Sequence, residues 1–218
     1  LTRLDICVMS DGAAATVLCS EEGLAKLEKA AGRRLPRVRV TGIGRGTDAM
    51  RMADRPHQSY DDFQKYNMLP SEDTAETRAY YRDLWDRGFR YPGVHSFRAG
   101  RMASKAAYAR AGISEPLKEI DFVELHDAYT SSEIQTYEDM GLCRYGGGGP
   151  FAASGKPFLA NVDYGLQFSE RDQVGACAVN PSGGLIACGH PVGATGLMQA
   201  VFALWQLQGT VAKHFKDD

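Results

Sequence analysis

The sequence predicts an α/β fold, and three observations support that prediction. Short apolar or β-branched runs, such as residues 38–43 and 120–125, alternate with segments of helical periodicity. The long apolar segment 193–208 has the composition of a helix that covers a sheet. Hydrophobic residues make up 44% of the 218 residues, enough for one large or two small domains with a core. We therefore expect helices packed on a mixed sheet.

The near balance of charges argues against several kinds of partner. Lys and Arg number 25 and Asp and Glu number 27, for a formal net charge of -2. This balance argues against a polybasic nucleic-acid surface and against a highly acidic disordered tail. No window approaches the roughly 18 unbroken apolar residues of a membrane span. Residues 1–10 also lack the basic start and long apolar middle of a signal peptide.

The cysteines follow no metal-binding or disulfide spacing. Their number is odd, their spacings are irregular, and no C-x-x-C pair occurs. We expect no metal site and a cytoplasmic location, where thiols stay reduced. Cys188 is expected to be a small buried residue rather than a reactive thiol. The five cysteines are Cys7, Cys19, Cys143, Cys177 and Cys188.

The first part of the chain predicts a strand, a helix and a second strand. Residues 13–19 are small and apolar, which favours a buried strand. Residues 21–31 predict a helix, because acidic residues open it and Gly32 can end it. The alternating, β-branched residues 38–43 predict another strand.

Residues 44–95 differ from the rest of the chain in composition. They mix Asp, Arg, Pro, Tyr and Met with weak periodicity, and one helix is expected over residues 74–85. We interpret the segment as an insertion or lid on the main fold. Residues 42–47 follow a predicted strand but lack the third glycine of a G-x-G-x-x-G motif, which argues against dinucleotide binding.

The remaining residues again predict helix and strand in turn. Residues 100–111 are small and helical, and residues 120–125 form a strand. The next helix begins at Thr130 or Ser131, because either residue is a suitable N-cap. Residues 144–173 predict a Gly-rich loop region.

The Gly-rich stretch 180–196 holds the first candidate functional residue, His190. It lies in a turn before a predicted helix, and Gly189 and Gly193 allow the backbone to approach a ligand closely. A histidine in such a loop can donate a hydrogen bond from one ring nitrogen while the loop fixes the other. The alternative is a strand-to-helix connection with a structural histidine.

His126, the second candidate, ends the strand in the stretch Val-Glu-Leu-His-Asp-Ala-Tyr. Folds of the α/β class place ligands at the carboxyl ends of strands. The neighbouring Asp127 either orients the imidazole or caps the following helix.

Together, VELHDAYTSSEIQTYEDMGLC and NPSGGLIACGHPVGATGLMQA resemble the second half of the thiolase superfamily. The branch that they resemble is that of the sterol-carrier-protein-type thiolases and related thiolase-like acyl-CoA enzymes. That branch has His-Asp-x-Phe where most thiolases have Asn-Glu-x-Phe. The stretches SDGAAATVLCS and AAYARAGISEPLKEIDFVELHDAY are similar to the family as well, so the resemblance runs from about Asp5 to Gly209.

The resemblance implies the layered α/β thiolase fold, mainly its C-terminal half. Residues 1–43 would end the N-terminal half or begin the C-terminal one. Residues 44–95 would be the insertion or lid, and residues 96–218 would form the C-terminal domain that carries both motifs.

The resemblance also implies an acyl-coenzyme A substrate. His190 matches the histidine that helps to activate a cysteine nucleophile and hydrogen-bonds a thioester oxygen. His126 matches a position that supports the same oxyanion hole. Coenzyme A is expected as substrate or product, with no permanently bound cofactor. The expected substrate-binding residues are Asn180, Gly183, Gly184, Gly189 and Gly193.

The sequence departs from the family in its cysteines. The nucleophilic cysteine belongs to the family's N-terminal half, which nothing here matches, and the later Cys-x-Gly motif is also missing. The 218 residues are therefore expected to be an incomplete thiolase. At the start of the predicted helix 100–111 and just before it, the basic residues Arg98, Arg101 and Lys105 are expected to face solvent rather than a coenzyme A phosphate.

Tyr129 is a second departure, because the family usually has Phe at this position. It is either a ring exchange in a packed site or a phenol placed beside His126 as an acid/base group. The second reading suits a lyase that cleaves a β-hydroxyacyl-CoA, such as a steroid side chain, by a retro-aldol reaction.

The leading prediction is an acetyl-CoA C-acyltransferase-like enzyme that cleaves or forms 3-oxoacyl-CoA, by thiolysis or Claisen condensation. His190 and His126 would hold the thioester oxygen. The alternatives are the lyase with Tyr129 as acid/base, and a non-catalytic thiolase-like subunit. Expected partners are acyl-CoA, a second copy in a homodimer, and a small OB-fold zinc-containing protein. No nucleic-acid partner is expected.

Overall fold

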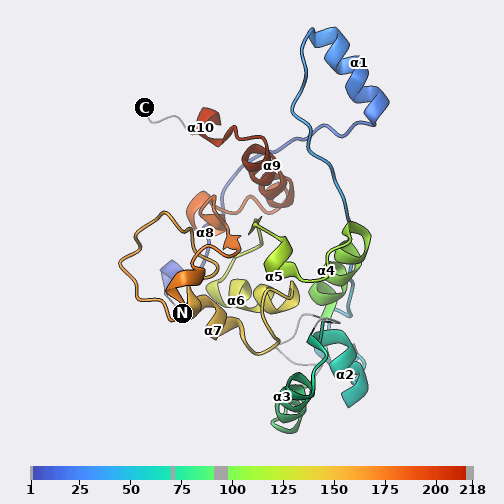
Figure 1. Cartoon of the computed structure of the whole chain (residues 1–218), viewed down its shortest axis with the longest axis vertical. Coiled ribbons are helices and arrows are strands. Elements are labelled where there is room, and N and C mark those ends of the chain that lie inside the picture. The colour runs from blue at the N-terminus through green and yellow to red at the C-terminus, as the bar shows by residue number, and fades with distance from the viewer. Residues whose placement is uncertain (1, 70–71, 91–97, 215–218) are drawn as a thin grey trace.

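The computed structural model describes residues 2–69, 72–90 and 98–214, in which helices surround a small parallel β pair (Figure 1). This arrangement confirms the expected α/β class. Within the described residues, no helix is both long and apolar enough to cross a membrane. The α-helices are α1 (Glu21–Ala31), α2 (Tyr60–Asn67), α3 (Ala75–Asp86), α4 (Arg98–Ala111), α5 (Pro116–Glu119), α6 (Thr130–Asp139), α7 (Gly148–Ser154), α8 (Gly184–Cys188), α9 (Thr195–Leu207) and α10 (Val211–His214).

The β structure is short and joins distant parts of the chain. β1 (Phe122–Val123) pairs in parallel with β2 (Ala178–Val179). Residues 6–9 add two single bridges, antiparallel to Tyr129 and parallel to His190. These bridges run in opposite directions, as in a mixed sheet, and they bring the N-terminal segment between the two histidine motifs.

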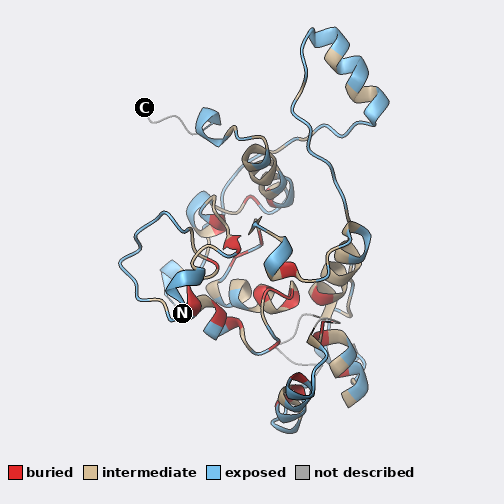
Figure 2. Ribbon diagram, viewed as in Figure 1, coloured by how far each residue is buried: buried red, intermediate tan, exposed pale blue. Residues whose placement is uncertain are grey.

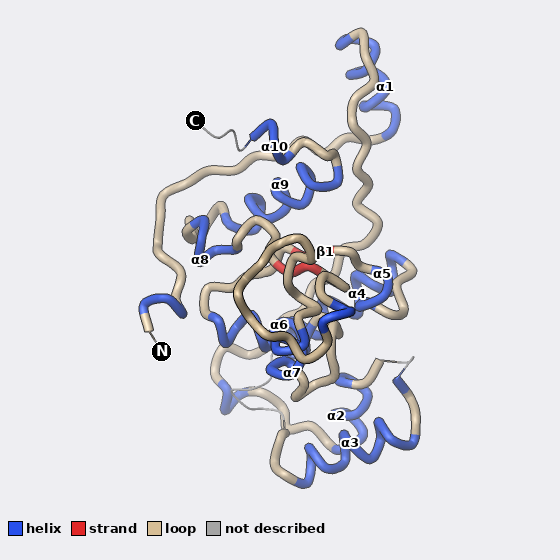
Figure 3. Tube along the Cα trace, turned by 60° about the vertical axis from the view of Figure 1, so that its left-hand side comes forward, coloured by secondary structure: helices blue, strands red, loops and turns tan. Residues whose placement is uncertain are grey.

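The predicted strands over residues 13–19 and 38–43 are wrong. Both segments form neither helix nor strand, and they lead to and from α1, which stands away from the rest of the molecule (Figure 3). Val17 and Leu18 are 85% and 82% exposed rather than buried. A β-branched run forms a strand only where a neighbouring strand accepts it, and no described segment pairs with either run.

The predicted helix over residues 21–31 is confirmed, because its signals are local. The Ser20 hydroxyl accepts a hydrogen bond from the Gly23 N–H at 3.1 Å and so caps the first turn of α1. Gly32, with φ of 62°, ends the helix in the left-handed region. The helix expected over residues 74–85 is confirmed in the same way, since Thr74 caps α3.

Three alternate glycines fit the extended residues 42–46 against α4. A Cβ atom added at Gly44 would lie 1.7 Å from the Ala103 carbonyl oxygen, and one added at Gly42 or Gly46 would lie 2.3 Å or 1.9 Å from another carbonyl oxygen of α4. The glycines that resemble part of a dinucleotide motif therefore serve close packing between backbone and helix.

Two hydrophobic clusters form the core (Figure 2). Leu125, Tyr137 and Phe151 belong to the first, which lies around α6 and α7. The second cluster joins α2 and α3 to the Gly-rich region through Phe63 and Tyr145, whose rings lie 5.6 Å apart. The segment interpreted as an insertion thus shares an aromatic cluster with the Gly-rich region that follows α6.

The basic face expected on the helix 100–111 is not solvated. Arg101 is 4% exposed, and its guanidinium donates to backbone carbonyls at the C-terminal ends of α2 and α6. Lys105 donates to the carbonyl oxygens of Lys65 and Met68. Carbonyls at helix C-termini carry partial negative charge and lack intrahelical donors, so they attract these cations. This bonding also leaves Arg101 and Lys105 engaged rather than directed at a phosphate.

Three further expectations need correction. Tyr129, not Thr130 or Ser131, is the N-cap of α6, and its side chain makes no capping bond. The region 144–173 contains α7 as well as loop. Cys188 is exposed rather than buried, because it ends α8 at the surface.

Candidate active site

The two histidine motifs meet in the structure. Nε2 of His126 lies 3.2 Å from Nε2 of His190, and the ring centroids are 4.9 Å apart at an interplanar angle of 74°. The segment 6–9 fixes both loops through its backbone: the Cys7 N–H donates to the Ala128 carbonyl, and the His190 N–H donates to the Val8 carbonyl. Residues separated by 64 positions in sequence therefore face each other across a hydrogen bond.

Thr195 determines which nitrogen of His190 carries the proton. The Thr195 hydroxyl donates to the Pro191 carbonyl at 3.1 Å and contacts Nδ1 of His190 at 2.7 Å. Since its one proton is used on Pro191, the hydroxyl accepts from Nδ1–H. Neutral His190 then has its lone pair on Nε2, and the Nε2–H of His126 donates to that lone pair.

Asp127 and Asn180 hold the two motif loops together. Asp127 is 2% exposed, and its Oδ1 accepts from the Leu185 N–H at 2.8 Å. It therefore caps α8 instead of orienting the imidazole or capping the helix that follows it. The Asn180 side-chain oxygen accepts from the Leu125 N–H at 2.8 Å, and Asn180 itself has a φ of 47°.

Glu124 provides a further link that the sequence analysis missed. Its carboxylate accepts hydrogen bonds from the backbone and hydroxyl of Ser182 and from the Gln206 side chain of α9. Burial raises the pKa of Glu124, against the opposing effect of those hydrogen bonds. The carboxylate thus ties the end of β1 to both the Gly-rich loop and α9.

A cavity of about 460 Å³ lies beside the histidine pair. It begins at His126 and Tyr129 and follows one face of α6 towards Asp139, with α4 and residues 48–55 supplying the other walls. Its polar lining residues are Asp48, Arg55, Arg98, Ser104, His126, Tyr129, Ser132, Thr136 and Asp139. The Tyr129 side chain is 46% exposed, and its hydroxyl forms no hydrogen bond with a described residue.

The glycines predicted to bind substrate do not line the cavity beside His126. Gly184 packs against Asp127, and a Cβ atom added there would lie 2.2 Å from Oδ2 of Asp127. Gly189 packs against Ser10, and an added Cβ would lie 2.3 Å from the Ser10 hydroxyl oxygen. Gly193 lines a separate hollow with residues 10–14. The structure therefore brings His126, His190 and Tyr129 together, whereas these glycines shape the loop itself.

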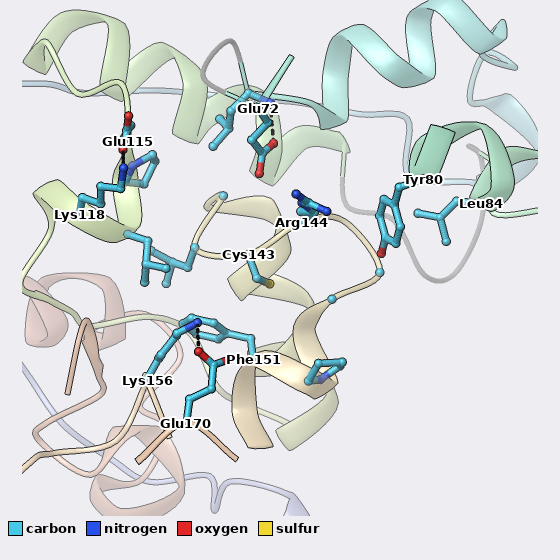
Figure 4. Close-up of a pocket in the computed structure, with 18 of the residues that line it drawn as sticks. Glu72, Tyr80, Leu84, Glu115, Lys118, Cys143, Arg144, Phe151, Lys156 and Glu170 are labelled. Atoms are coloured by element: carbon cyan, nitrogen blue, oxygen red, sulfur yellow. Dashed lines mark hydrogen bonds and ion pairs between the residues drawn. The ribbon is translucent and has the colours of Figure 1, made fainter. Parts of the chain in front are cut away.

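Another cavity, of about 840 Å³, lies between α3, α5 and α7 and contains neither histidine (Figure 4). Lys156 forms an ion pair with Glu170 at 2.9 Å, and Lys118 pairs with Glu115. The Cys143 thiol also faces this space, and burial raises its pKa far above the usual range. The charged groups here are largely paired with one another.

Cys143, Cys177 and Cys188 lack the lowered pKa of an activated nucleophile. Burial raises the pKa of Cys177 to about 11, and burial together with nearby Glu124 and Asp127 raises the pKa of Cys188. The Cys188 thiol donates to the Ser182 carbonyl at 3.4 Å. A thiol activated for attack has a lowered pKa instead.

Asp139 makes the stability of the fold depend on pH. Burial raises its pKa to about 8, so the folded chain keeps a proton that the unfolded chain releases above about pH 4. The free energy of unfolding therefore falls as the pH rises from about 4 to 8, by a few kcal/mol as an order of magnitude. Asp139→Asn removes this pH-dependent loss. The variant's free energy of unfolding should therefore exceed that of the wild type by more at pH 9 than at pH 5.

Urea unfolding of the wild type and of Asp139→Asn at pH 5 and pH 9 measures the difference in stability. Asp163→Asn, on an exposed loop, is the control. An equal gain at both pH values would contradict the prediction.

The fold and the site define an α/β domain in which two loop motifs present a histidine pair beside a cavity. By sequence, the chain belongs to the thiolase superfamily: residues 90–217 match the family described as thiolase C-terminal domain-like.

Individual relatives agree with this assignment. Sterol carrier protein 2 of Oryctolagus cuniculus is 32% identical over 213 residues, which cover 98% of this chain and 29% of that protein. The benzoylsuccinyl-CoA thiolase subunit BbsB of Thauera aromatica is 29% identical over 208 residues, or 95% of this chain and 39% of that subunit. An acetyl-CoA acetyltransferase of Methanocaldococcus jannaschii is 37% identical over 115 residues, which cover 53% of this chain and 26% of that protein. The chain thus spans less than a third of the sterol carrier protein 2 length.

Proposed function

We propose that this chain carries the histidine side of an acyltransferase site that cleaves or forms 3-oxoacyl-CoA. The observation that carries the proposal is the 3.2 Å contact between Nε2 of His126 and Nε2 of His190. Two ring nitrogens at this separation can both donate to one oxygen placed between them. An oxygen that gains negative charge in the reaction is the group that such donors stabilise.

The proton positions suggest an order of events. The lone pair on Nε2 of His190 takes the proton of a thiol, and the resulting thiolate attacks the 3-oxo carbon of the substrate. The C2–C3 bond breaks, and its electron pair moves onto the acetyl-CoA fragment as an enolate. Nε2–H groups of His190 and His126 then both donate to the enolate oxygen. We propose that the thiol comes from a residue outside these 218.

The second half-reaction restores the protein. The enolate takes up at carbon the proton that Nε2 of His190 removed from the thiol, and it leaves as acetyl-CoA. A second coenzyme A attacks the acyl-enzyme thioester, which releases the shortened acyl-CoA and the free thiol. The protein thus needs coenzyme A as a substrate and no permanently bound cofactor.

A thiolysis assay on the protein in its native length tests the proposal. Acetoacetyl-CoA with coenzyme A should give two molecules of acetyl-CoA, and none should form without coenzyme A. Cleavage of a β-hydroxyacyl-CoA without coenzyme A would instead support a lyase. Absence of both activity and acyl-CoA binding would support a non-catalytic subunit.

A lyase is the second candidate, because Tyr129 lies at the same cavity as His126 and its hydroxyl is free of bonds to described residues. If the phenol moves the proton of a β-hydroxyl group, Tyr129→Phe should lower kcat for retro-aldol cleavage by roughly 10²- to 10⁴-fold. The measurement is release of the ketone or aldehyde product from a β-hydroxyacyl-CoA. Tyr164→Phe, in the loop before β2, is the control, and an unchanged rate in Tyr129→Phe removes the phenol from the mechanism.

We also propose a homodimer as the working form, with cytoplasmic location and an OB-fold zinc-containing partner as further expectations. Large apolar side chains stand exposed along the N-terminal segment, including Met9 at 82% and Val17 at 85%. Exposed apolar surface of this kind marks contact with other protein. The molecular mass of the native protein in solution, with and without co-purifying protein, tests these expectations.

A further inference from the structure

The cavity beside His126 contains a buried carboxyl group that the proposed reaction does not use. Asp139 is 6% exposed and lines the cavity at the end of α6. Its Oδ2 lies against Gly100, which lines the same cavity, and a Cβ atom at position 100 would be only 2.8 Å from that oxygen. The absence of a side chain at Gly100 therefore makes room for the carboxyl group.

Among the described residues, the only hydrogen bond to Asp139 from a side chain reaches its backbone carbonyl, and none reaches its carboxyl group. Arg101 approaches from α4, but its guanidinium donates to backbone carbonyls, including that of Asp139 itself. A carboxyl group that lines the cavity, and that no described side chain engages, is placed to meet a polar ligand atom.

We propose that this cavity receives the acyl group of the substrate, and that Asp139 hydrogen-bonds an oxygen atom carried on that group beyond the thioester. The inference rests on the proposed acyl-CoA function and names its substrate class: acyl groups with a hydroxyl or carboxylate at the far end, rather than plain alkyl chains.

The length and walls of the cavity fit such a group. Tyr129 and Asp139 stand ten positions apart on α6, which corresponds to roughly 15 Å along a helix. A volume of about 460 Å³ falls within the range of small-molecule sites. Ser132 and Thr136 lie between the two ends on the same face of α6 and give this wall small polar groups, while Ala99 and Met140 add apolar carbon.

The protonation of Asp139 favours an acceptor oxygen on the substrate. Burial raises its pKa to about 8, with Glu138 raising and Arg101 lowering it, so near pH 7 the group is mainly the neutral acid. Across the cavity it faces Arg98, Arg55 and Asp48. A neutral carboxyl O–H can donate to a hydroxyl or to a carboxylate oxygen.

Three ten-carbon substrates test the proposal on the native-length protein: 3-oxodecanoyl-CoA and its analogues that end in a hydroxyl or a carboxylate. At least one oxygenated chain should show a kcat/KM roughly 10- to 100-fold above the methyl-ended chain, mainly through KM. The two oxygenated arms show which of the two ends is preferred. Equal values for all three chains would overturn the proposal.

Variants at position 139 separate binding from folding. Asp139→Leu should bring the three substrates to a common kcat/KM, whereas Asp139→Asn keeps a donor and should keep the preference. Asp163→Leu, on an exposed loop, is the control and should also keep it. A preference that survives Asp139→Leu would overturn the role of this carboxyl group.

Binding of the three acyl-CoAs by calorimetry distinguishes failure of this inference from failure of the proposed function. If no thiolysis occurs but the oxygenated chains bind more tightly in an Asp139-dependent way, the cavity assignment holds and the acyltransferase proposal fails. If thiolysis occurs without any preference in rate or binding, the acyltransferase proposal holds and the cavity assignment fails.

Discussion

Replacing His190 with Ala is expected to lower kcat for thiolysis by at least roughly 10²- to 10³-fold, the loss that follows removal of one oxyanion donor. The variant loses both the lone pair that accepts the thiol proton and the N–H that then donates to the enolate oxygen. It also leaves His126 without the partner that lies 3.2 Å away. The measurement is kcat for acetoacetyl-CoA with saturating coenzyme A, in the protein of native length.

His214→Ala is the matched control for this variant. His214 is exposed in α10 and stacks on Trp205 at 3.9 Å between ring centroids, away from both motif loops. Its replacement should leave kcat within about twofold, since it contacts no group at the site. Near-normal turnover in His190→Ala would exclude the assigned role, whatever the control shows.

Helices were predictable from the sequence where their signals are local. Ser20, Thr74 and Gly32 act on the backbone within a few residues, so caps and stops fix α1 and α3 without reference to the rest of the molecule. The strands expected over residues 13–19 and 38–43 failed for the opposite reason. A strand needs a partner from elsewhere in the chain, and propensity alone does not supply one.

In the candidate site, too, the sequence predicted features with a local signal and missed those that depend on distant neighbours. The motifs around His126 and His190 predicted two functional histidines, and the structure places them in contact. The roles of Thr195 and Asp139 were missed, because each depends on a neighbour that the spacing does not reveal. For Thr195 a signal did exist: a hydroxyl five positions after His190, at the start of a helix, lies within reach of its ring.

Arg101 shows how a correct pattern led to a wrong interpretation. Arg98, Arg101 and Lys105 are spaced to share one face of α4, and that spacing indicated a basic face exposed to solvent. The sequence does not show that the C-terminal ends of α2 and α6 meet this face. There Tyr108 donates to the Met140 carbonyl at 2.7 Å, beside the carbonyls that bind Arg101.

Arg101→Met is expected to lower the free energy of unfolding by about 3–5 kcal/mol, the range for removing one partner of a buried charged network. Methionine keeps much of the apolar volume but leaves the Tyr66 carbonyl without its described donor. The Asn67 and Glu138 carbonyls lose a charged donor, although each keeps a second one, the Tyr81 hydroxyl and the Gly141 N–H. Each buried acceptor left unsatisfied costs about 1–3 kcal/mol. The loss of the two charged hydrogen bonds to Asn67 and Glu138 adds to this cost, and relief from burying the guanidinium offsets part of it.

Urea unfolding followed by circular dichroism measures the loss, with Arg110→Met as the matched control on the same helix. Arg110 is exposed and donates to the Ile43 carbonyl alone among the described residues, so its replacement should cost less than about 1 kcal/mol. Similar losses in both variants would show that Arg101 adds little beyond general helix packing.

Arg101→Lys distinguishes the charge from the geometry of the guanidinium. A lysine ammonium keeps the positive charge, but it is a compact group with three donors and cannot reach both helix ends as the planar fork does. We therefore expect it to recover less than half of the stability lost in Arg101→Met. Because Arg101 binds the backbone of Glu138 and Asp139, where α6 borders the cavity, a loosened α6 end should also weaken acyl-CoA binding. That coupling would connect the packing of α2 and α3 to the site that they do not touch.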